Sequence, residues 1–254
     1  MTFPIEDIYL TIIGSLRTVG VFIMIPVFAG RMIPSRVRVF LALLMGVLIL
    51  PTLQGKGLLP PTFADLTIAF MKEIIVGLMM GFAIHMVFFA VEFGGEIMAS
   101  EISLTRGSTF DLQTHEHRSG IALLLFNFAM LLFFITGMHR EMLYAIVKSY
   151  ECVPYGLFGN GFGNIELILK ATSNVFLLGV RMAAPMIALN FVVTVTFAIL
   201  GKAAPNFNVF VVSFAARILA GLMLLSLVVG LLTQYILTDM RQGPTLMLKF
   251  LLRE

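Results

Sequence analysis

Residues 66–93 read LTIAFMKEIIVGLMMGFAIHMVFFAVEF, and this run decides the class of fold. Its charged side chains are Lys72 and Glu73 near the start and Glu92 near the end. The apolar part exceeds the roughly 18 to 20 residues that cross the hydrocarbon core of a bilayer. Lipid offers no hydrogen-bond partners to the backbone, so the segment must be helical there. The run therefore predicts a membrane-spanning helix.

The whole chain has the same character. Its 254 residues are 59% hydrophobic and 12% charged, which excludes an ordinary soluble protein. The net charge is +3 without a dense basic patch, so we expect no nucleic-acid partner. The single cysteine, Cys152, cannot form an internal disulfide, and no Cys/His spacing suits a metal, so we expect neither metal nor cofactor. The start lacks the basic region of a signal peptide, so we expect the first apolar segment to be retained.

Six apolar stretches are predicted to be helical, which indicates an all-α membrane protein. The second and fourth barely reach spanning length, which is typical of re-entrant or buried helices. Pro26 and Pro185 remove helical hydrogen bonds, so we expect a kink or break in the first and fifth. The stretches cover residues 8–30, 39–53, 66–93, 121–136, 175–200 and 209–237.

Two long polar connections, at residues 92–120 and 137–170, divide the chain. The second holds a glycine-rich turn region, so we expect a domain boundary near residue 165, between parts at 1–165 and 166–254. Lys and Arg residues divide evenly between the two sets of loops, so the positive-inside rule gives no orientation. Either the two short stretches are misplaced ordinary spans, or the chain does not cross the bilayer in the usual up-and-down way.

Charged side chains also lie inside the apolar stretches. At a bilayer centre each Arg or Lys costs about 2.5 to 3.5 kcal/mol, so we expect these groups to face protein, water or the headgroup zone. They could form an ion or proton path, or they could anchor interfaces in a multi-subunit complex or snorkel to a helix end. The ion or proton path is less favoured because Glu73 is the one acidic candidate at depth and Lys72 can neutralise it. The polar residues concerned are Arg17, Lys72, Glu73, His85, Arg181 and Arg217.

Small residues accompany these charges. Gly77 and Gly81 form a GxxxG pattern, which lets helices approach closely in lipid. Glu73 and His85 lie four residues to either side, on the same helical face. We therefore predict a small, polar face that packs against partner helices.

The connection at 92–120 is the most polar region of the chain. Gly94 and Gly95 would let it bend sharply, so we expect a gate there. Its His115-Glu116-His117 triplet lacks the i, i+4 spacing of a helical zinc site, so a solvated loop is expected rather than a metal site. The sequence holds no nucleophile elbow, P-loop, dinucleotide fingerprint or paired catalytic carboxylates, so we expect no enzyme activity.

Several stretches, in the right order along the chain, resemble the FliR/SctT family of export-gate proteins. They are RTVGVFIMIPVF at 17–28, Lys72-Glu73 with Gly77 and Gly81, Gly137-Met138-His139-Arg140 with Ser149-Tyr150 and Pro154, VFLLGVRMAAP at 175–185, and APNFNVF at 204–210. The chain departs from the family pattern in the polar loop at Glu101, Ser103 and Asp111-Leu112. It also departs at Asn206, where a glutamine is usual, and at Arg217, where a lysine is usual.

The resemblance implies a subunit of the type III protein-export channel in the bacterial inner membrane, of flagellar or injectisome type. Family members are built like a FliP-like part, here 1–165, fused to a FliQ-like hairpin, here 166–254. The implied partners are FliP-like and FliQ-like gate subunits, a FlhB-like switch protein, exported unfolded proteins and membrane lipid. Together the gate subunits would form a closed conical pore.

The resemblance also implies roles for two groups of residues. A plug segment at 101–113 would gate the pore, and the turn between the hairpin helices would act as a hinge. The gating residues are Glu101, Ser103, Leu104, Thr105, Arg106, Gly107, Ser108, Phe110, Asp111 and Gln113, and the hinge residues are Pro205, Asn206 and Asn208.

A self-sufficient small-molecule or ion transporter is the alternative function. In that case the broken helices and buried arginines would form a site for an anionic substrate. Deletion of residues 104–113 separates the two hypotheses, because it should make an export pore leaky and should abolish uptake by a transporter. An intramembrane enzyme has no catalytic pair to support it.

Overall fold

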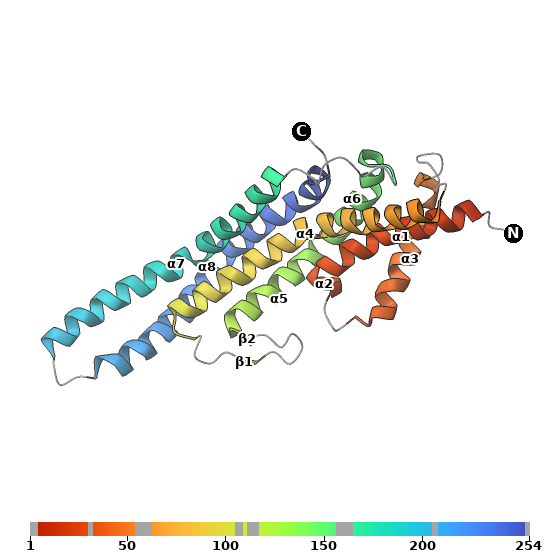
Figure 1. Ribbon diagram of the computed structural model, residues 1–254. Helices are drawn as coiled ribbons and strands as arrows, with labels where there is room; N and C mark the ends of the chain where they lie inside the picture. Colours follow the sequence, from red (N-terminus) through yellow and green to blue (C-terminus); the bar gives the residue numbers. More distant parts are fainter. Residues whose placement is uncertain are drawn as a thin grey trace. The chain divides into compact units, whose positions relative to one another are not determined.

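The computed structural model describes residues 5–29, 33–53, 62–104, 109–110, 117–155, 165–204 and 208–251. Helices account for almost all of them (Figure 1). One strand pair in this part of the chain joins β1 (Thr109–Phe110) antiparallel to β2 (His117–Arg118). The helices are α1 (Ile5–Met24), α2 (Pro26–Ala29), α3 (Ser35–Leu53), α4 (Phe63–Glu101), α5 (Gly120–Ile135), α6 (Met138–Cys152), α7 (Ile165–Ala203) and α8 (Val209–Lys249).

Five of the described helices, α1, α3, α4, α7 and α8, are long and apolar enough to cross a membrane. Helices α5 and α6 pass the same test together but are bent by 68°, as in a broken span or a re-entrant loop. The prediction of an all-α membrane protein is confirmed. The second apolar stretch is longer than expected, because α3 has 19 residues and includes Arg36 and Arg38 in its first turn.

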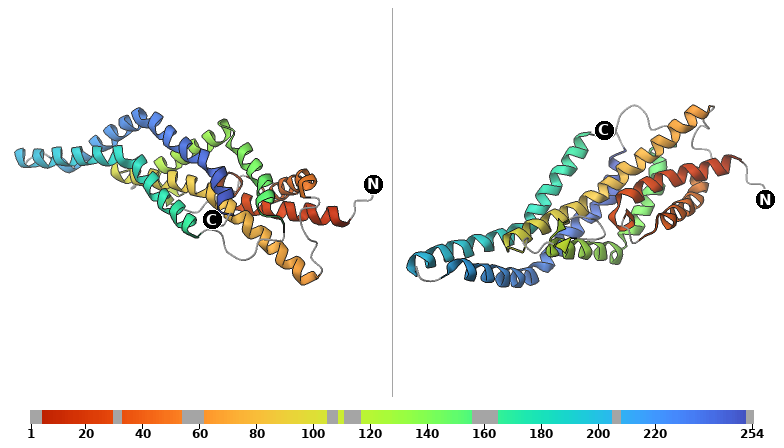
Figure 2. Two further views of the ribbon diagram at one scale, coloured as in Figure 1. Left: turned by 90° about the horizontal axis from the view of Figure 1, so that it is seen from above. Right: turned by 60° about the horizontal axis from the view of Figure 1, so that its bottom comes forward.

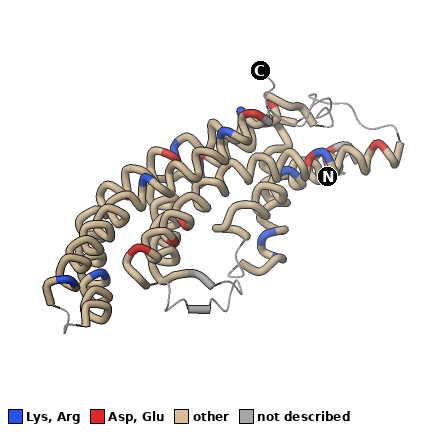
Figure 3. The backbone as a smooth tube through the Cα atoms, turned by 60° about the vertical axis from the view of Figure 1, so that its left-hand side comes forward, with Lys and Arg blue, Asp and Glu red and all other residues tan. Residues whose placement is uncertain are grey.

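The chain folds into two compact units. Unit 1 comprises Met1–Val87, Phe133–Thr172 and Met240–Glu254, and unit 2 comprises Phe88–Leu132 and Ser173–Asp239. Helices α4, α5, α7 and α8 each contribute residues to both units. Charged residues are sparse along these helices, with long uncharged stretches between them (Figure 3).

In unit 1, glycines bring α1 close to two other helices. A Cβ atom on Gly14 would lie 3.3 Å from the Cα atom of Gly46 in α3. On a different stretch of α1, a Cβ atom on Gly20 would lie 2.6 Å from the carbonyl oxygen of Ile74 in α4. No side chain fits at such a separation, so glycine sets how closely α1 and α4 pack.

In unit 2, α4 uses the Gly94-Gly95 pair in the same way. A Cβ atom on Gly95 would lie 2.6 Å from the Cα atom of Ala122 in α5, and one on Gly94 would lie 3.3 Å from that of Gly179 in α7. The expected sharp bend at this pair is therefore wrong. Helix α4 runs without a break to Glu101, so the polar connection begins about ten residues later than position 92.

The two prolines that were expected to interrupt helices, Pro26 and Pro185, act differently. The break at Pro26 is confirmed, since α1 ends at Met24 and α2 starts at Pro26. Pro185 does not break its helix, because α7 continues from Ile165 to Ala203. A proline within an apolar helix is tolerated where neighbouring groups satisfy the freed carbonyl. Helices α7 and α8 then run side by side as a hairpin next to their connection (Figures 1 and 2).

Candidate functional site: a buried arginine that joins three helices

Arg17 lies in the middle of α1, and its side chain is fully buried. It is the largest such side chain in the described part of the molecule. Its Nε donates a hydrogen bond to Oε2 of Glu73 in α4 at 2.8 Å, and Glu73 is also fully buried. A charge withdrawn from water is tolerated only where it is paired and hydrogen-bonded, and Glu73 provides both.

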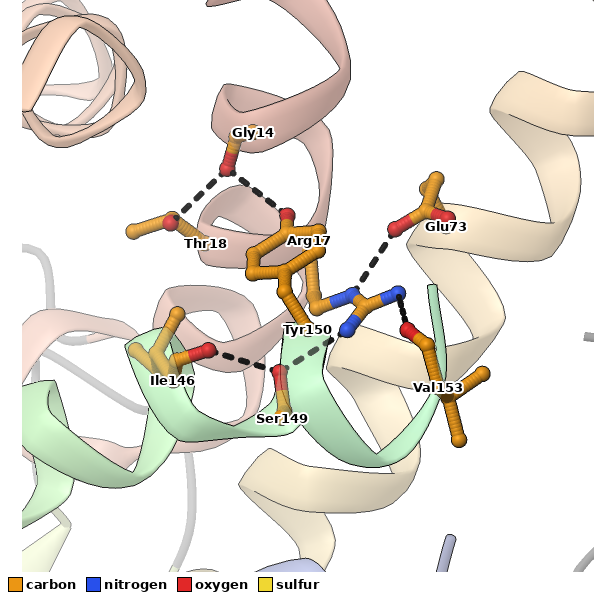
Figure 4. Close-up of polar contacts among 8 residues, drawn as sticks. All are labelled: Gly14, Arg17, Thr18, Glu73, Ile146, Ser149, Tyr150 and Val153. Carbon is orange, nitrogen blue, oxygen red and sulfur yellow. Dashed lines mark hydrogen bonds and ion pairs between the residues drawn. The ribbon is translucent and has the colours of Figure 1, made fainter. Parts of the chain in front are cut away.

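The rest of the guanidinium binds the C-terminal end of α6 (Figure 4). Nη1 donates to Oγ of Ser149 at 2.8 Å, and Nη2 donates to the carbonyl oxygen of Val153 at 3.1 Å. Val153 is the C-cap residue of α6. The last carbonyls of a helix lack intrahelical donors and carry partial negative charge, so a cation there stabilises the helix end.

Tyr150 covers one face of the same guanidinium. Cζ of Arg17 lies 3.7 Å from the centre of the Tyr150 ring, which gives a cation–π interaction. The Tyr150 hydroxyl donates to the carbonyl oxygen of Gly14 in α1 at 3.4 Å, and the Thr18 hydroxyl donates to the same oxygen at 3.1 Å. We call Arg17, Glu73, Ser149, Tyr150 and Val153 the Arg17 node.

The Arg17 node is suited to holding helices together. Each of the three guanidinium nitrogens of Arg17 donates to a group of the same chain. The side chains of Glu73, Ser149 and Tyr150 are all 0% exposed. An anionic substrate would have to displace these internal bonds, so the chemistry of the node favours fixation of α1, α4 and α6 at one point over ligand binding.

The sequence interpretation assigned the wrong partner to Glu73. Lys72 was expected to neutralise it, but Lys72 is partly exposed and the ion pair is made by Arg17. Adjacent residues on a helix point in different directions and do not face each other. Ser149 was not expected as a partner either, because it lies 132 positions from Arg17 in the chain.

The small, polar face of α4 exists as predicted, but it is covered by α1 of the same chain. A Cβ atom on Gly77 would overlap the carbonyl oxygen of Arg17, and one on Gly81 would lie 2.8 Å from that of Val21. Nδ1 of His85 lies 2.9 Å from the carbonyl oxygen of Met24. The partner helix of this face is therefore α1 of the same unit, and these residues pack against it within unit 1.

The two arginines of the hairpin lie in unit 2. Arg181 is exposed on α7, and Arg217 is partly buried on α8. Nη2 of Arg217 donates to Oγ1 of Thr194 in α7 at 3.2 Å. Its Nε is buried and has no hydrogen-bond partner among the described residues. Arg217 thus differs from Arg17 in keeping an unused donor.

Only part of the predicted plug segment can be located. Oε2 of Glu101 accepts a hydrogen bond from Nδ2 of Asn190 in α7 at 2.6 Å. Ser103 has a positive φ of 63° just after α4, and Leu104 follows it. The backbone of Phe110 pairs with His117 in the strand pair. The other predicted gating residues, Thr105, Arg106, Gly107, Ser108, Asp111 and Gln113, lie outside the described residues.

The predicted hinge is described at one of its three positions. Pro205 and Asn206 lie outside the described residues. Oδ1 of Asn208 accepts a hydrogen bond from the backbone N–H of Val211 at 3.4 Å, which makes Asn208 the N-cap of α8. Asn208 therefore marks where the second hairpin helix begins.

Within the described residues, no group of three or more His, Cys, Asp or Glu side chains is placed to hold a metal ion. His115 and Glu116 of the triplet lie outside the described residues. His117 is described by its backbone alone, in β2. The prediction about this triplet stays a prediction.

Comparison with known proteins matches nearly the whole chain to one family. The family described as bacterial export proteins, family 1, matches residues 8–243. The chain is 28% identical to the flagellar biosynthetic protein FliR of Caulobacter vibrioides over 211 residues, which are 82% of this chain and 84% of that protein. It is 26% identical to FliR of Escherichia coli over 223 residues, 87% of this chain and 84% of that one. FliR of Bacillus subtilis is 25% identical over 213 residues, 83% of this chain and 82% of the relative.

Proposed function

Because the chain belongs to bacterial export protein family 1, the FliR/SctT family, and is a membrane component of an export apparatus, we propose that it is a structural and gating subunit of a type III protein-export channel. The relatives named above are flagellar proteins, which favours a flagellar system over an injectisome. The cargo is then unfolded protein, and the channel lies in the bacterial inner membrane. The role is structural and not enzymatic.

The observation that carries a multi-subunit channel is the surface of the α7–α8 hairpin. Large apolar side chains are exposed there, with Phe191 at 70% and Leu227 at 80%. Arg217 lies on the same hairpin with its buried Nε unbonded among the described residues. A lipid-facing arginine at depth costs about 2.5 to 3.5 kcal/mol, whereas an acidic or carbonyl group of a neighbouring subunit would complete its hydrogen bonds.

The direction of the Arg217 side chain supports a partner protein over the membrane surface. Arg217 lies eight residues after the start of α8 at Val209, which is about 12 Å along the helix at 1.5 Å per residue. Its guanidinium donates sideways to Thr194, nine residues before the end of α7. The side chain is thus directed across the hairpin and not toward its tip, so a partner protein is the better solution.

We assign the covering partners to FliP-like and FliQ-like gate subunits, with a FlhB-like switch protein as a further contact. In this proposal residues 1–165 take the FliP-like role and residues 166–254 form the FliQ-like hairpin. Arg181, exposed on α7, belongs to the same partner surface. The Arg17 node gives the FliP-like part a fixed geometry on which assembly depends.

The transporter alternative is less well supported at Arg17. It required the buried arginines to bind an anion, but the guanidinium of Arg17 is already bonded to Glu73, Ser149 and Val153. Arg217 and the break at Pro26 remain compatible with it, but a broken helix also suits packing around a pore axis.

The test is to co-express the tagged chain with the FliP-like and FliQ-like proteins of the same organism and to determine the mass of the purified particle by native mass spectrometry. We expect a discrete hetero-oligomer, and no stable particle from the chain alone. A stable homo-oligomer, further stabilised by a small anion, would overturn the proposal.

The plug is tested in the same complex. Deletion of residues 104–113 should leave the particle assembled and should raise the ion permeability of membranes that contain it. An assembled, tight particle that still exports substrate would show that this segment does not close the pore.

A further inference from the structure

The last turn of α4 contacts both helices of the hairpin. Glu101 accepts the 2.6 Å hydrogen bond from Asn190 of α7. The next residue, Ile102, is 1% exposed and lies against Gly221 of α8. A Cβ atom on Gly221 would collide with Cγ2 of Ile102 and would lie 2.9 Å from its Cβ. All four residues belong to unit 2. Two consecutive residues thus hold α4 to two different helices.

The end of α4 has a defined backbone geometry. The N–H of Ser103 donates to the carbonyl oxygen of Ser100 at 3.1 Å, and that of Leu104 donates to Ala99 at 2.9 Å. This pair of bonds is a Schellman motif, in which the residue after the helix adopts the left-handed conformation. Ser103 occupies that position with φ 63°, where glycine is favoured. A non-glycine residue persists there only where surrounding contacts fix the backbone.

Asn190 is itself oriented by a chain of polar groups. Arg217 of α8 donates to Oγ1 of Thr194 at 3.2 Å. The Thr194 hydroxyl donates to the backbone carbonyl of Asn190 at 2.7 Å and lies 3.4 Å from its Oδ1. With Oδ1 turned toward Thr194, the amide nitrogen of Asn190 is directed at Glu101. The hairpin thereby presents a donor at one fixed place.

The other end of the polar connection is tied to α4 as well. Oε1 of Glu96 accepts a hydrogen bond from the backbone N–H of Ser119 at 2.8 Å. Ser119 precedes α5, and its hydroxyl accepts the N–H of Ala122 at 3.2 Å as an N-cap. Both ends of the polar connection are therefore held. Its start, at the end of α4, is bonded to the hairpin, and its end, before α5, is bonded to α4.

We infer that Asn190 and Gly221 are positioning residues that fix the C-terminal turn of α4 on the α7–α8 hairpin. Asn190 supplies the hydrogen bond, and Gly221 supplies the space that Ile102 fills. The inference rests on the proposed function, because it gives the proposed plug segment a fixed point of departure. A movement of the hairpin would then be transmitted to the end of α4.

A cross-link tests the geometry without reference to export. In the co-purified complex with Cys152→Ser, the pair Ile102→Cys and Gly221→Cys should form a disulfide under mild oxidation. A small shift brings the Cβ atoms from 2.9 Å into the roughly 3.5 to 4.5 Å range of disulfides. The matched control is Ile102→Cys with Gly230→Cys, because Gly230 on the same helix has no atom within 4 Å of an added Cβ. The disulfide is measured as protection of the two cysteines from a maleimide reagent. This protection should be lost after reduction.

The functional test uses the space at Gly221. Gly221→Ala should collide with Ile102, loosen the end of α4 and increase ion leak through the complex severalfold. Ile102→Ala in the same chain removes the overlap with Cγ2 and leaves only the 2.9 Å approach of the two Cβ atoms, so the double variant should leak less than Gly221→Ala. Gly230→Ala is the control and should behave as the parent. Rescue by the second substitution distinguishes positioning from general damage to the helix.

The hydrogen bond is tested separately at Asn190. Asn190→Leu should increase leak in the same way. Thr196→Val on α7 should not, because among the described residues Thr196 bonds its own helix at the Val192 carbonyl. Glu101→Gln keeps an acceptor oxygen and should stay tight.

The outcomes separate the inference from the proposed function. No disulfide at Ile102 and Gly221, or an equal yield with the Gly230 control, overturns the geometry. A leaky deletion of residues 104–113 together with tight Asn190→Leu and Gly221→Ala variants overturns the positioning role. If deletion of residues 104–113 leaves the complex tight, the gating part of the proposed function is contradicted. The disulfide result tests the geometry independently of that outcome.

Discussion

Two of the arginines inside apolar helices, Arg17 and Arg217, have different surroundings. Arg17 in unit 1 is fully buried and bonds Glu73 together with two groups of α6. Arg217 in unit 2 bonds one threonine hydroxyl, and its buried Nε has no partner among the described residues. Within the described residues, each guanidinium nitrogen of Arg17 has a partner, whereas the Nε of Arg217 has none. In the proposed function the first charge serves folding and the second serves assembly.

The helices around Arg17 and Arg217 also differ in how much of their apolar surface is buried within the chain. In α4, which carries Glu73, 56% of the most apolar window is buried within the chain, but in α7 and α8 the share is 11% each. Helix α4 therefore obtains more of its packing from the chain itself than the two hairpin helices do. The hairpin obtains little, so its apolar side chains are free for lipid or for other subunits. Substitutions at the two sites should have different consequences.

The largest loss of stability is expected for Arg17→Met. It leaves the buried Glu73 carboxylate without its cation, which should lower stability by about 3 to 5 kcal/mol. The measurement is the thermal unfolding midpoint of the detergent-purified complex, or its yield if none survives. Arg17→Met with Glu73→Met replaces the pair by apolar groups and should recover most of the loss. If the single variant is as stable as the double, the ion pair does not hold unit 1 together.

The next effect is expected for Gly77→Ala. The added methyl group would overlap the carbonyl oxygen of Arg17, so α1 and α4 must separate, and overpacking of this kind costs about 1 to 3 kcal/mol. Gly230→Ala is the matched control. Its Cβ meets nothing within 4 Å, so it should stabilise α8 by about 0.5 to 1 kcal/mol through helix propensity. Equal unfolding midpoints for the two variants would contradict the close contact of α1 and α4.

Arg217→Met should affect assembly more than stability, in contrast to Arg17→Met. Removal of a partly buried charge whose bond among the described residues is to Thr194 should change the free energy of unfolding of the complex that still assembles by less than about 1 kcal/mol. Assembly with the FliP-like and FliQ-like proteins should fall, because the partner's acceptor would lose its cation. Native mass spectrometry of the co-expressed complex reads this out. A fully assembled complex would place Arg217 against lipid or water instead.

The sequence predicted those features that depend on local patterns. Hydropathy located the apolar helices and singled out Arg17 and Glu73 as charges at depth. It could not pair them, because their contact joins positions 56 residues apart. Lys72, which is next to Glu73 in the sequence, points in another direction on the helix. Ser149 and Tyr150 appeared only as part of a motif. Their role depends on where α6 ends, which the tertiary fold decides.

The glycines also show that a local sequence pattern does not identify the neighbouring helix. The GxxxG pattern at Gly77 and Gly81 predicted close helix packing, but it could not tell whether the neighbouring helix is α1 of the same chain or a helix of another subunit. The pair Gly94-Gly95 was predicted as a bend and proved to be a contact with α5 and α7 inside one long helix. A glycine permits both a bend and a close approach, so only the neighbouring helix tells them apart.

The smallest effect is expected at the end of α4, where Ser103 holds the left-handed conformation at φ 63°. A side chain in that conformation costs about 1 to 2 kcal/mol relative to glycine. Glycine also gains freedom in the unfolded chain, about 0.5 to 1 kcal/mol, so Ser103→Gly should give a net gain of about 0.5 to 1 kcal/mol. Ser103→Val should lose stability, because a branched side chain is least compatible with positive φ. The thermal unfolding midpoints of the two complexes should therefore move in opposite directions. A loss with glycine would mean that the contacts of Glu101 and Ile102 do not fix this turn, and that the end of α4 is not held on the hairpin.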